Sequence, residues 1–140
     1  MKEEEIIQPV SKELLKSELT PDRLLRVTNK SHNDIYVFSA ADAPNLMDEV
    51  GRLREEAFRN AGGGTGKAKD IDEFDLMPGC CKQLIVWNPD NEEIIGGYRY
   101  VFGADWKFGK DGQPILATSH MFHFSDKFLK EYAPYTVELG

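Results

Sequence analysis

A short acidic stretch contains the first residue types that could do chemistry. Its four carboxylates belong to Asp70, Asp72, Glu73 and Asp75. A solvated loop would explain such a run on composition alone. However, Phe74 lies within the run, and an apolar side chain there would anchor the loop against a core and fix the direction of the carboxylates. Carboxylates held beside a cleft can orient an amine or accept its proton, which is the functional interpretation of this run.

An arginine in a strand-like run is the second candidate. Side chains alternate between the two faces of a strand, so Arg99 points away from the face of Tyr98 and Tyr100. Its own face is shared with Gly97 and Val101. A charged group among apolar neighbours costs free energy unless it is paired. Arg99 is therefore predicted to be paired with a carboxylate or to be functional.

A glycine-rich run at residues 62–67 (GGGTGK) resembles a phosphate-binding loop. The full pattern requires glycine where this chain has Ala61, and serine or threonine where it has Ala68. It also requires a preceding strand, whereas the periodicity here predicts a helix. We therefore interpret the run as the flexible end of a helix with a basic tip. Its backbone amides could still bind an acidic substrate or carrier.

Histidine and cysteine do not combine into a predicted metal site. His120 and His123 are three residues apart, but their region is more typical of strand and turn than of helix, and the only other histidine is His32. Cys80 and Cys81 are adjacent, which disfavours a disulfide between them. We expect solvated or hydrogen-bonded histidines, reduced and buried cysteines, and neither a metal nor a permanently bound cofactor.

The composition is that of an ordinary globular domain. The 140 residues carry a formal net charge of -7, so the chain has no basic surface of the kind that nucleic-acid binding requires. The acidic N-terminus does not resemble a signal peptide, and no apolar run is long enough to span a bilayer. We expect one domain in the cytoplasm or peripheral to the inner membrane, without nucleic acid as a partner.

Apolar periodicity predicts which elements position these residues. A long helix is the clearest: Asp42 can cap it, Leu46, Val50 and Leu53 recur on one face, and it ends at the glycines 62–64. The other expected elements are two short helices from residue 11 and residue 20, a strand at 35–38, a long loop at 62–79, a hairpin of 83–87 with 94–102, a turn at 109–112, a short strand at 121–124, a helix capped by Ser125 and a strand at 135–139.

Five stretches, taken in order, resemble the acyl-carrier-dependent branch of the GNAT superfamily of N-acyltransferases. That branch includes bacterial enzymes for lyso-ornithine and lyso-glycine lipids, often labelled hemolysin-like, and the related acyl-homoserine-lactone synthases. The similarity covers about residues 35–140. The sequences of residues 61–75 and 118–124 most resemble those of the Bacteroidetes members. The stretches are residues 52–59 (RLREEAFR), 72–75 (DEFD), 83–87 (QLIVW), 94–100 (IIGGYRY) and 137–140 (VELG).

This resemblance implies a fold and a set of site residues. The fold would be α/β (α+β), with antiparallel strands opening a GNAT-like mixed sheet flanked by helices. Residues 1–30 would form a helical extension, and residues 31–140 the N-terminal part of the domain, ending before the donor-binding loop. The implied catalytic residues are Asp72, Asp75 and Glu138, and the implied substrate-binding residues are Arg54, Phe58 and Arg99.

The implied activity is transfer of a 3-hydroxyfatty acyl group to the amino group of glycine or ornithine in lipid synthesis. Acyl carrier protein or coenzyme A would carry the donor as a thioester, and the chain alone would be inactive. Two alternatives stay open: a non-catalytic docking module for acyl carrier protein, and an acyl-homoserine-lactone synthase. Docking on an acidic carrier requires a basic patch, for which Arg52, Arg59, Lys67 and Lys69 are the candidates. Peripheral membrane contact and self-association through an exposed edge strand are further hypotheses.

Overall fold

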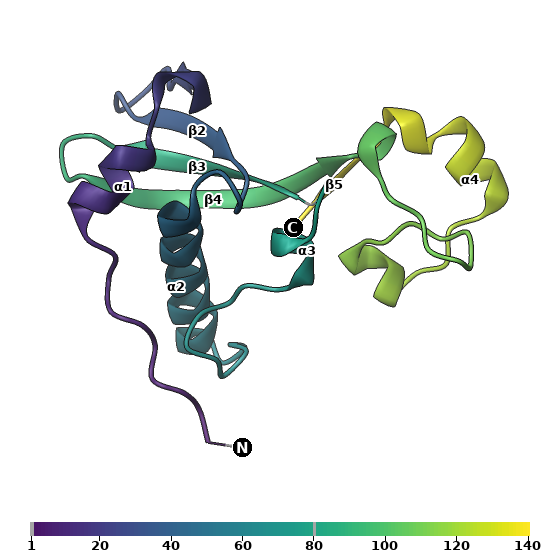
Figure 1. The fold of residues 1–140 in the computed structure, drawn as a ribbon, viewed down its shortest axis with the longest axis horizontal. Coiled ribbons are helices and arrows are strands. Elements are labelled where there is room, and N and C mark those ends of the chain that lie inside the picture. Colours follow the sequence, from purple (N-terminus) through teal and green to yellow (C-terminus); the bar gives the residue numbers. More distant parts are fainter. Residues whose placement is uncertain (1, 80) are drawn as a thin grey trace.

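The computed structural model describes residues 2–79 and 81–140, and it shows an α/β arrangement in which helix α2 lies across one face of a sheet (Figure 1). The sheet has five strands in the order β1-β2-β3-β4-β5, and every neighbouring pair is antiparallel. This confirms the predicted fold class. The helices are α1 (Lys12–Glu18), α2 (Pro44–Asn60), α3 (Glu73–Leu76) and α4 (Asp126–Glu131), and the strands are β1 (Leu24–Val27), β2 (Asp34–Phe38), β3 (Lys82–Asn88), β4 (Glu93–Phe102) and β5 (Val137–Leu139).

The β3–β4 hairpin is the centre of the sheet and confirms the predicted hairpin. Its turn is closed by the side chain of Asn88, whose Oδ1 accepts hydrogen bonds from the backbone of Asp90 and Asn91. Side chains alternate along β3, so Gln83, Ile85 and Trp87 are buried. The register places Gln83 opposite Arg99. Arg99 therefore points to the buried face, as the two-residue period predicts.

Helix α2 begins one residue later than predicted, and its cap is different. Ala43 is the N-cap, whereas the carboxylate of Asp42 accepts a hydrogen bond from the hydroxyl of Ser39. The first amides of α2 are instead satisfied by Glu18, whose Oε1 accepts from the backbone N of Leu46 at 2.7 Å. The prediction of Asp42 as the cap was wrong because a carboxylate from α1, remote in the sequence, occupies that end of the helix.

The N-terminal segment differs from the prediction in its second half. Helix α1 is present and buries Leu15 in the core beside α2. The expected second helix is only a 3₁₀ turn, Pro21–Arg23, which leads directly into β1 at the edge of the sheet. Ahead of α1, the backbone of Glu4 and Ile7 bonds to that of the loop at Gly66 and Ala68.

Two further segments correct the sequence prediction. The expected loop at 62–79 contains the short helix α3, which begins with a reciprocal capping box between Asp72 and Asp75. The short strand predicted at 121–124 is wrong, because this segment follows a 3₁₀ turn, Ala117–His120, and the amides of Met121 and Phe122 bond back to Thr118. The turn at 109–112, helix α4 and strand β5 are confirmed, although β5 starts at Val137.

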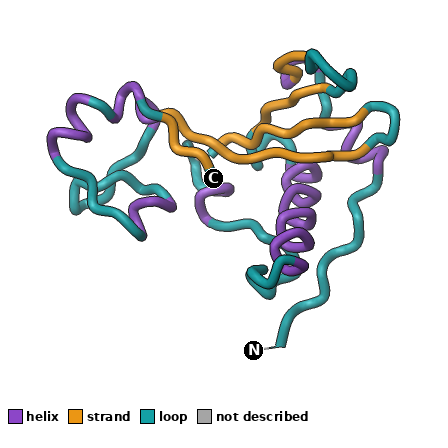
Figure 2. Tube along the Cα trace, turned by 180° about the vertical axis from the view of Figure 1, so that it is seen from behind, coloured by secondary structure: helices purple, strands orange, loops and turns teal. Residues whose placement is uncertain are grey.

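The apolar interior consists of two clusters. The first packs α1 and α2 against the sheet and includes Phe38, Leu46, Met47, Ile85 and Trp87. The second lies at the far end of β4, where residues 103–136 form a separate lobe before the chain returns to the sheet as β5 (Figure 2). Its members are Phe74, Cys81, Val101, Trp106, Leu116 and Ala133. Cys81 is buried as predicted, whereas Cys80 lies outside the described residues. Among the described residues, no helix has the length and apolarity needed to cross a bilayer.

Candidate active site

Four of the predicted site residues meet where α2, α3 and β4 approach one another. Arg54 of α2 donates from Nη1 to both carboxylate oxygens of Asp75, at 3.2 Å each. Arg99 of β4 donates from Nη1 to Oδ1 of Asp72 at 2.6 Å and lies 3.2 Å from Oδ2 of Asp75. Residues separated by up to 45 positions thus form one network of alternating charges.

A fifth member of the network, Gln83, was not predicted from the sequence. It is 1 % exposed, donates from Nε2 to Asp75 at 2.6 Å and accepts from Nη2 of Arg54 at the same distance. The amide of Gln83 is therefore bonded to both Arg54 and Asp75 and holds these two side chains in their relative positions. A signal was present, since Gln83 occupies a position in β3 whose face is otherwise apolar, with Ile85 and Trp87.

The central carboxylate is deeply buried. The side chain of Asp75 retains 1 % exposure, and its oxygens face Arg54, Arg99, Gln83 and the backbone N of Asp72. A buried anion is stable only when it is paired and hydrogen-bonded in this way. Asp75 is consequently engaged in holding the two guanidinium groups in place.

The charges and hydrogen bonds of this network shift the pKa values of Asp72 and Arg99. Burial raises the pKa of Asp72, but the hydrogen bond and the charge of Arg99 outweigh it, so the pKa lies below its usual range. Burial likewise lowers the pKa of Arg99, but the hydrogen bond to Asp72 and the charges of Asp75 and Asp72 leave it above its ordinary value. Asp72 and Arg99 therefore stay charged around neutral pH.

The two other predicted substrate-binding positions on α2 share a cleft. Arg54 and Phe58 line a hollow of about 350 Å³ between α2 and the hairpin. Its walls are mostly apolar, and the ring of Phe58 is half exposed. The remaining lining includes Val50, Leu53, Ala57, Ile85, Ile94, Ile95 and Tyr98. A hollow with an apolar wall and a guanidinium at one end suits an elongated apolar group with a polar end.

Glu138, the third predicted catalytic residue, lies outside the network but on the same side of the sheet. Strand β5 places it opposite Val101, two positions from Arg99 on the same face of β4. Its Oε2 accepts hydrogen bonds from the backbone N and the hydroxyl of Thr118. Glu138 is thus a carboxylate held by neutral donors, whereas Asp72 and Asp75 are held by arginines.

Comparison with known proteins identifies the family to which this part of the chain is similar. Residues 53–140, which include all six predicted site residues, match the family model described as the acetyltransferase (GNAT) domain. The chain belongs to the GNAT acetyltransferase family. No solved structure is detectably similar.

Two curated relatives are more specific. The chain is 66% identical over 137 residues to a protein of Phocaeicola vulgatus and 68% identical over 137 residues to one of Bacteroides thetaiotaomicron. Both are named glycine N(alpha)-acyltransferase. The matches cover 98% of this chain but only 42% and 41% of the relatives, so the chain spans about two fifths of their length. The GNAT resemblance is confirmed, and its acyl-carrier branch stays a prediction.

The glycine-rich run of this GNAT chain binds a carboxylate of its own. The backbone amides of Thr65 and Gly66 both donate to Glu55 of α2, at 2.9 Å each, and Arg59 also bonds to Glu55. Glu55 therefore occupies the position that an anionic ligand would take in a phosphate-binding loop. These two amides are not available to a substrate or carrier.

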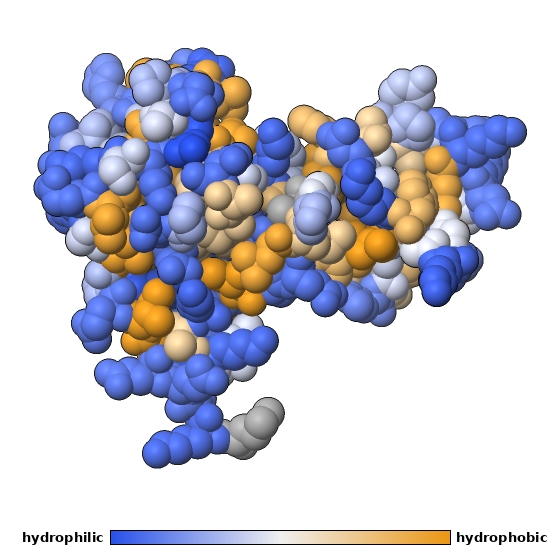
Figure 3. Space-filling model, viewed as in Figure 1, coloured by the Kyte–Doolittle hydropathy of each residue, from blue (hydrophilic) through white to orange (hydrophobic). Residues whose placement is uncertain are grey.

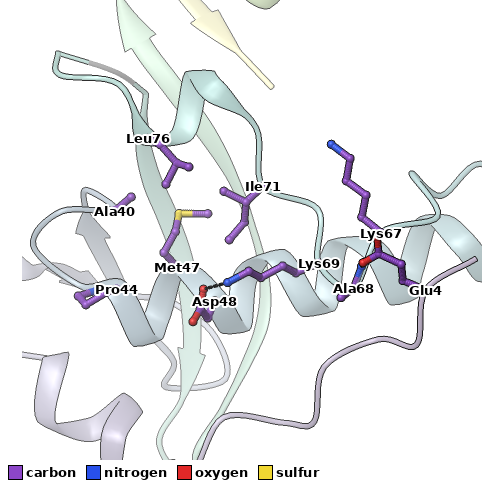
Figure 4. Close-up of a pocket in the computed structure, with 10 residues that line it drawn as sticks. All are labelled: Glu4, Ala40, Pro44, Met47, Asp48, Lys67, Ala68, Lys69, Ile71 and Leu76. Carbon is purple, nitrogen blue, oxygen red and sulfur yellow. Dashed lines mark hydrogen bonds and ion pairs between the residues drawn. The ribbon is translucent and has the colours of Figure 1, made fainter.

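A second, larger cleft lies on the other side of this loop. It measures about 440 Å³ and has an apolar floor of Met47, Ile71 and Leu76, with Lys67 and Lys69 along one wall (Figure 4). Figure 3 shows apolar atoms gathered on this face between α2 and α3. None of the six predicted site residues lines it. The larger cleft is therefore separate from the network formed by Arg54, Asp72, Asp75 and Arg99.

Most of the basic patch that carrier docking would require is already paired. Arg52 bonds to Glu49 and Glu56, Arg59 bonds to Glu55, and Lys69 bonds to Asp48. Of the four candidates, Lys67 alone has no carboxylate partner among the described residues. Docking of an acyl carrier protein on this surface stays a prediction without support from these contacts.

Proposed function

We propose that the protein containing this chain transfers an acyl group from a thioester to the amino group of glycine. The observation that carries the proposal is the convergence of Arg54, Asp72, Asp75 and Arg99 beside an apolar cleft in a GNAT chain. The name that the two relatives share, glycine N(alpha)-acyltransferase, supports glycine as the acceptor.

The proposed reaction needs little covalent participation from the protein. The neutral amine nitrogen of glycine attacks the thioester carbonyl carbon, the carbon–sulfur bond breaks, and the sulfur leaves as a thiol. The proton lost by the amine balances the proton gained by the sulfur. Orientation and charge placement then supply most of the rate enhancement.

The roles of the residues follow from their surroundings. Glu138 is held by neutral donors and can contact the ammonium group of glycine and accept its proton. Asp72 and Asp75 act by fixing the arginines, because their oxygens are already bonded to Arg99 and Arg54. In this proposal Arg54 and Phe58 lie along the path of the acyl chain.

The donor and the product are proposed from the resemblance to the lipid-forming branch. A long-chain 3-hydroxyacyl group would arrive on acyl carrier protein or coenzyme A, and the product would be an N-acylglycine that enters amino-acid-lipid synthesis. Ornithine is the alternative acceptor. The mostly apolar walls of the cleft support an acyl chain as its occupant.

The experiment measures thiol release and the mass of the amide product in the full-length protein. Long-chain 3-hydroxyacyl carrier protein and the matching acyl-coenzyme A are offered with glycine or ornithine. We expect N-acylglycine and stoichiometric thiol. Thiol release that does not depend on any amine, or no product with either donor, would contradict the proposed function.

The role of Glu138 is tested in the same assay. Glu138→Gln keeps an oxygen that Thr118 can donate to but removes the base, so we expect kcat to fall by about 10²–10⁴-fold. Glu131→Gln, on the exposed side of α4, is the matched control. An unchanged kcat in Glu138→Gln would reject this residue as the base.

A further inference from the structure

The guanidinium of Arg99 has hydrogen-bonding capacity that the network does not use. Its bonds to Asp72 and Asp75 are both made by Nη1. No residue within 2–79 or 81–140 accepts a hydrogen bond from its Nε or Nη2. These two groups form the side of the guanidinium that binds a carboxylate through two parallel bonds.

The neighbours of Arg99 hold this side in a fixed direction. The guanidinium carbon lies 5.8 Å from the centroid of the Phe74 ring, so an aromatic ring covers the guanidinium from one direction. The side chain keeps 13 % exposure, so it is not fully enclosed by the network. The residue opposite, directly after β5, is Gly140, where a Cβ would lie 2.9 Å from Nε. The absence of a side chain there leaves room beside Nε.

A carboxylate of opposite charge lies within reach on the same face. The backbone of Arg99 is bonded to that of Gly140, and Glu138 of β5 precedes Gly140 by two residues. Diagonal neighbours of this kind on an antiparallel pair are roughly 7 Å apart. At this backbone spacing, the cationic side chain and the anionic side chain can both reach the two ends of one small α-amino acid zwitterion. An amine without a carboxylate would leave the arginine side unoccupied.

We propose that Nε and Nη2 of Arg99 bind the α-carboxylate of the acceptor while Glu138 binds its amino group, so that the site selects unblocked α-amino acids over simple amines. This inference rests on the proposed acyl transfer. It adds a reason for the acidic pair Asp72 and Asp75: by holding Nη1, they turn the other side of the guanidinium toward β5. Arg99 is then a specificity-determining residue.

The test compares glycine with glycinamide as acceptor in the full-length protein. Glycinamide keeps the amine but has no carboxylate, and its amine is less basic, so intrinsic reactivity at neutral pH favours glycinamide. We expect kcat/KM for glycine to exceed that for glycinamide by about 10- to 100-fold, the range of a charged hydrogen-bonded contact. This comparison uses the unmodified protein, so it does not depend on the folding of a variant.

Variants then assign the preference to Arg99. Arg99→Lys keeps the charge that Asp72 and Asp75 require but loses the two-point contact, and we expect the preference for glycine to fall to within about threefold of unity through a higher KM. Arg52→Lys is the matched control, because Arg52 is also paired with two carboxylates and is 14 % exposed. It should keep the preference.

The outcomes separate this inference from the proposed function. Equal use of glycine and glycinamide would overturn the carboxylate contact and leave acyl transfer standing. A preference that survives in Arg99→Lys would overturn the assignment to Arg99. Failure to acylate any amine would overturn the proposed function, and this inference with it.

Discussion

At the residue scale, Asp75 is the single side chain on which the network most depends. Replacing it by asparagine removes the negative charge between Arg54 and Arg99, both of which stay largely buried. Breaking a buried ion pair by removing one partner costs about 3–5 kcal/mol. We therefore expect Asp75→Asn to lower the free energy of unfolding by that amount in urea titrations.

The matched control for this prediction is a paired aspartate on the surface. Asp48 bonds to Lys69 at 2.6 Å, but both side chains are 41 % exposed. Surface pairs contribute about 0–1 kcal/mol, so Asp48→Asn should change the unfolding free energy little. Equal losses in the two variants would show that burial of Asp75 does not govern its contribution.

The residue scale is also where the sequence says least about the site. The acidic run and the face of Arg99 were predictable, because apolar anchors and a two-residue period are local properties. The partner of each group was not, since Arg54, Gln83 and Arg99 meet only after three elements pack together. The set of predicted residues came from the family resemblance. Whether each of them donates a hydrogen bond, accepts a proton or holds another side chain in place depends on tertiary contacts, which the spacing of residues in the sequence does not show.

At the element scale, substitution of two adjacent glycines in β4 by alanine is expected to have different effects on stability. A Cβ on Gly97 would lie 2.4 Å from the backbone oxygen of Leu84 in β3, whereas a Cβ on Gly96 meets nothing within 4 Å. Overpacking against backbone that cannot move typically costs about 1–3 kcal/mol. We expect Gly97→Ala to destabilise the protein by this amount, and Gly96→Ala to change it by less than about 0.5 kcal/mol, in thermal or urea unfolding. Similar effects from both would contradict the close approach of β3 and β4 at Gly97.

The hydrogen bonds between Glu55 of α2 and the following loop are expected to make the stability of the fold depend on pH. Hydrogen bonds from Thr65, together with those from Arg59 and Gly66, lower the pKa of Glu55 from 4.5 to about 2, although desolvation opposes the shift. Because the folded pKa is the lower one, this stabilisation is complete above pH 4.5 and is lost as the pH falls toward 2.

Substitution of Glu55 should remove that dependence. We expect Glu55→Gln to unfold at a lower urea concentration at pH 7 and to show a flatter dependence of the urea midpoint between pH 4.5 and 2. Glu56→Gln is the control, since Glu56 is half exposed and, within residues 2–79 and 81–140, forms its ion pair with Arg52 alone. Parallel pH curves for Glu55→Gln and the unmodified protein would exclude Glu55 as the source.

The elements that could be predicted were those with a long local pattern. Helix α2 and the β3–β4 hairpin were predicted because their apolar periods run over several turns or residue pairs. The elements that were missed form through pairing with other strands or through side-chain caps, which leave no long pattern in the sequence. Strand β1 forms by pairing with β2, and α3 forms through a four-residue capping box. The expected strand at 121–124 had suitable residues, but its amides bond to a preceding turn.

At the scale of the whole molecule, the two apolar clusters differ in what supports them. The first is enclosed by the long helix α2 and the middle of the sheet. The second lies where α3 and the end of β4 meet the separate lobe in Figure 2, whose own elements are 3₁₀ turns and the short helix α4. Regions with fewer buried apolar contacts open at lower free energy, and the second cluster has fewer buried members than the first. We expect the second cluster to unfold first.

The two tryptophans allow this order to be measured. Trp87 is buried in the first cluster and Trp106 in the second, each less than a tenth exposed. In urea, the fluorescence of Trp106 in a Trp87→Phe variant should change at a lower concentration than that of Trp87 in a Trp106→Phe variant. Far-ultraviolet circular dichroism of both variants serves as the control for the cost of each substitution. Coincident transitions by both tryptophans would show one cooperative unit. An earlier transition at Trp106 would mean that the part of the molecule carrying Thr118, the partner of Glu138, opens before the first cluster does.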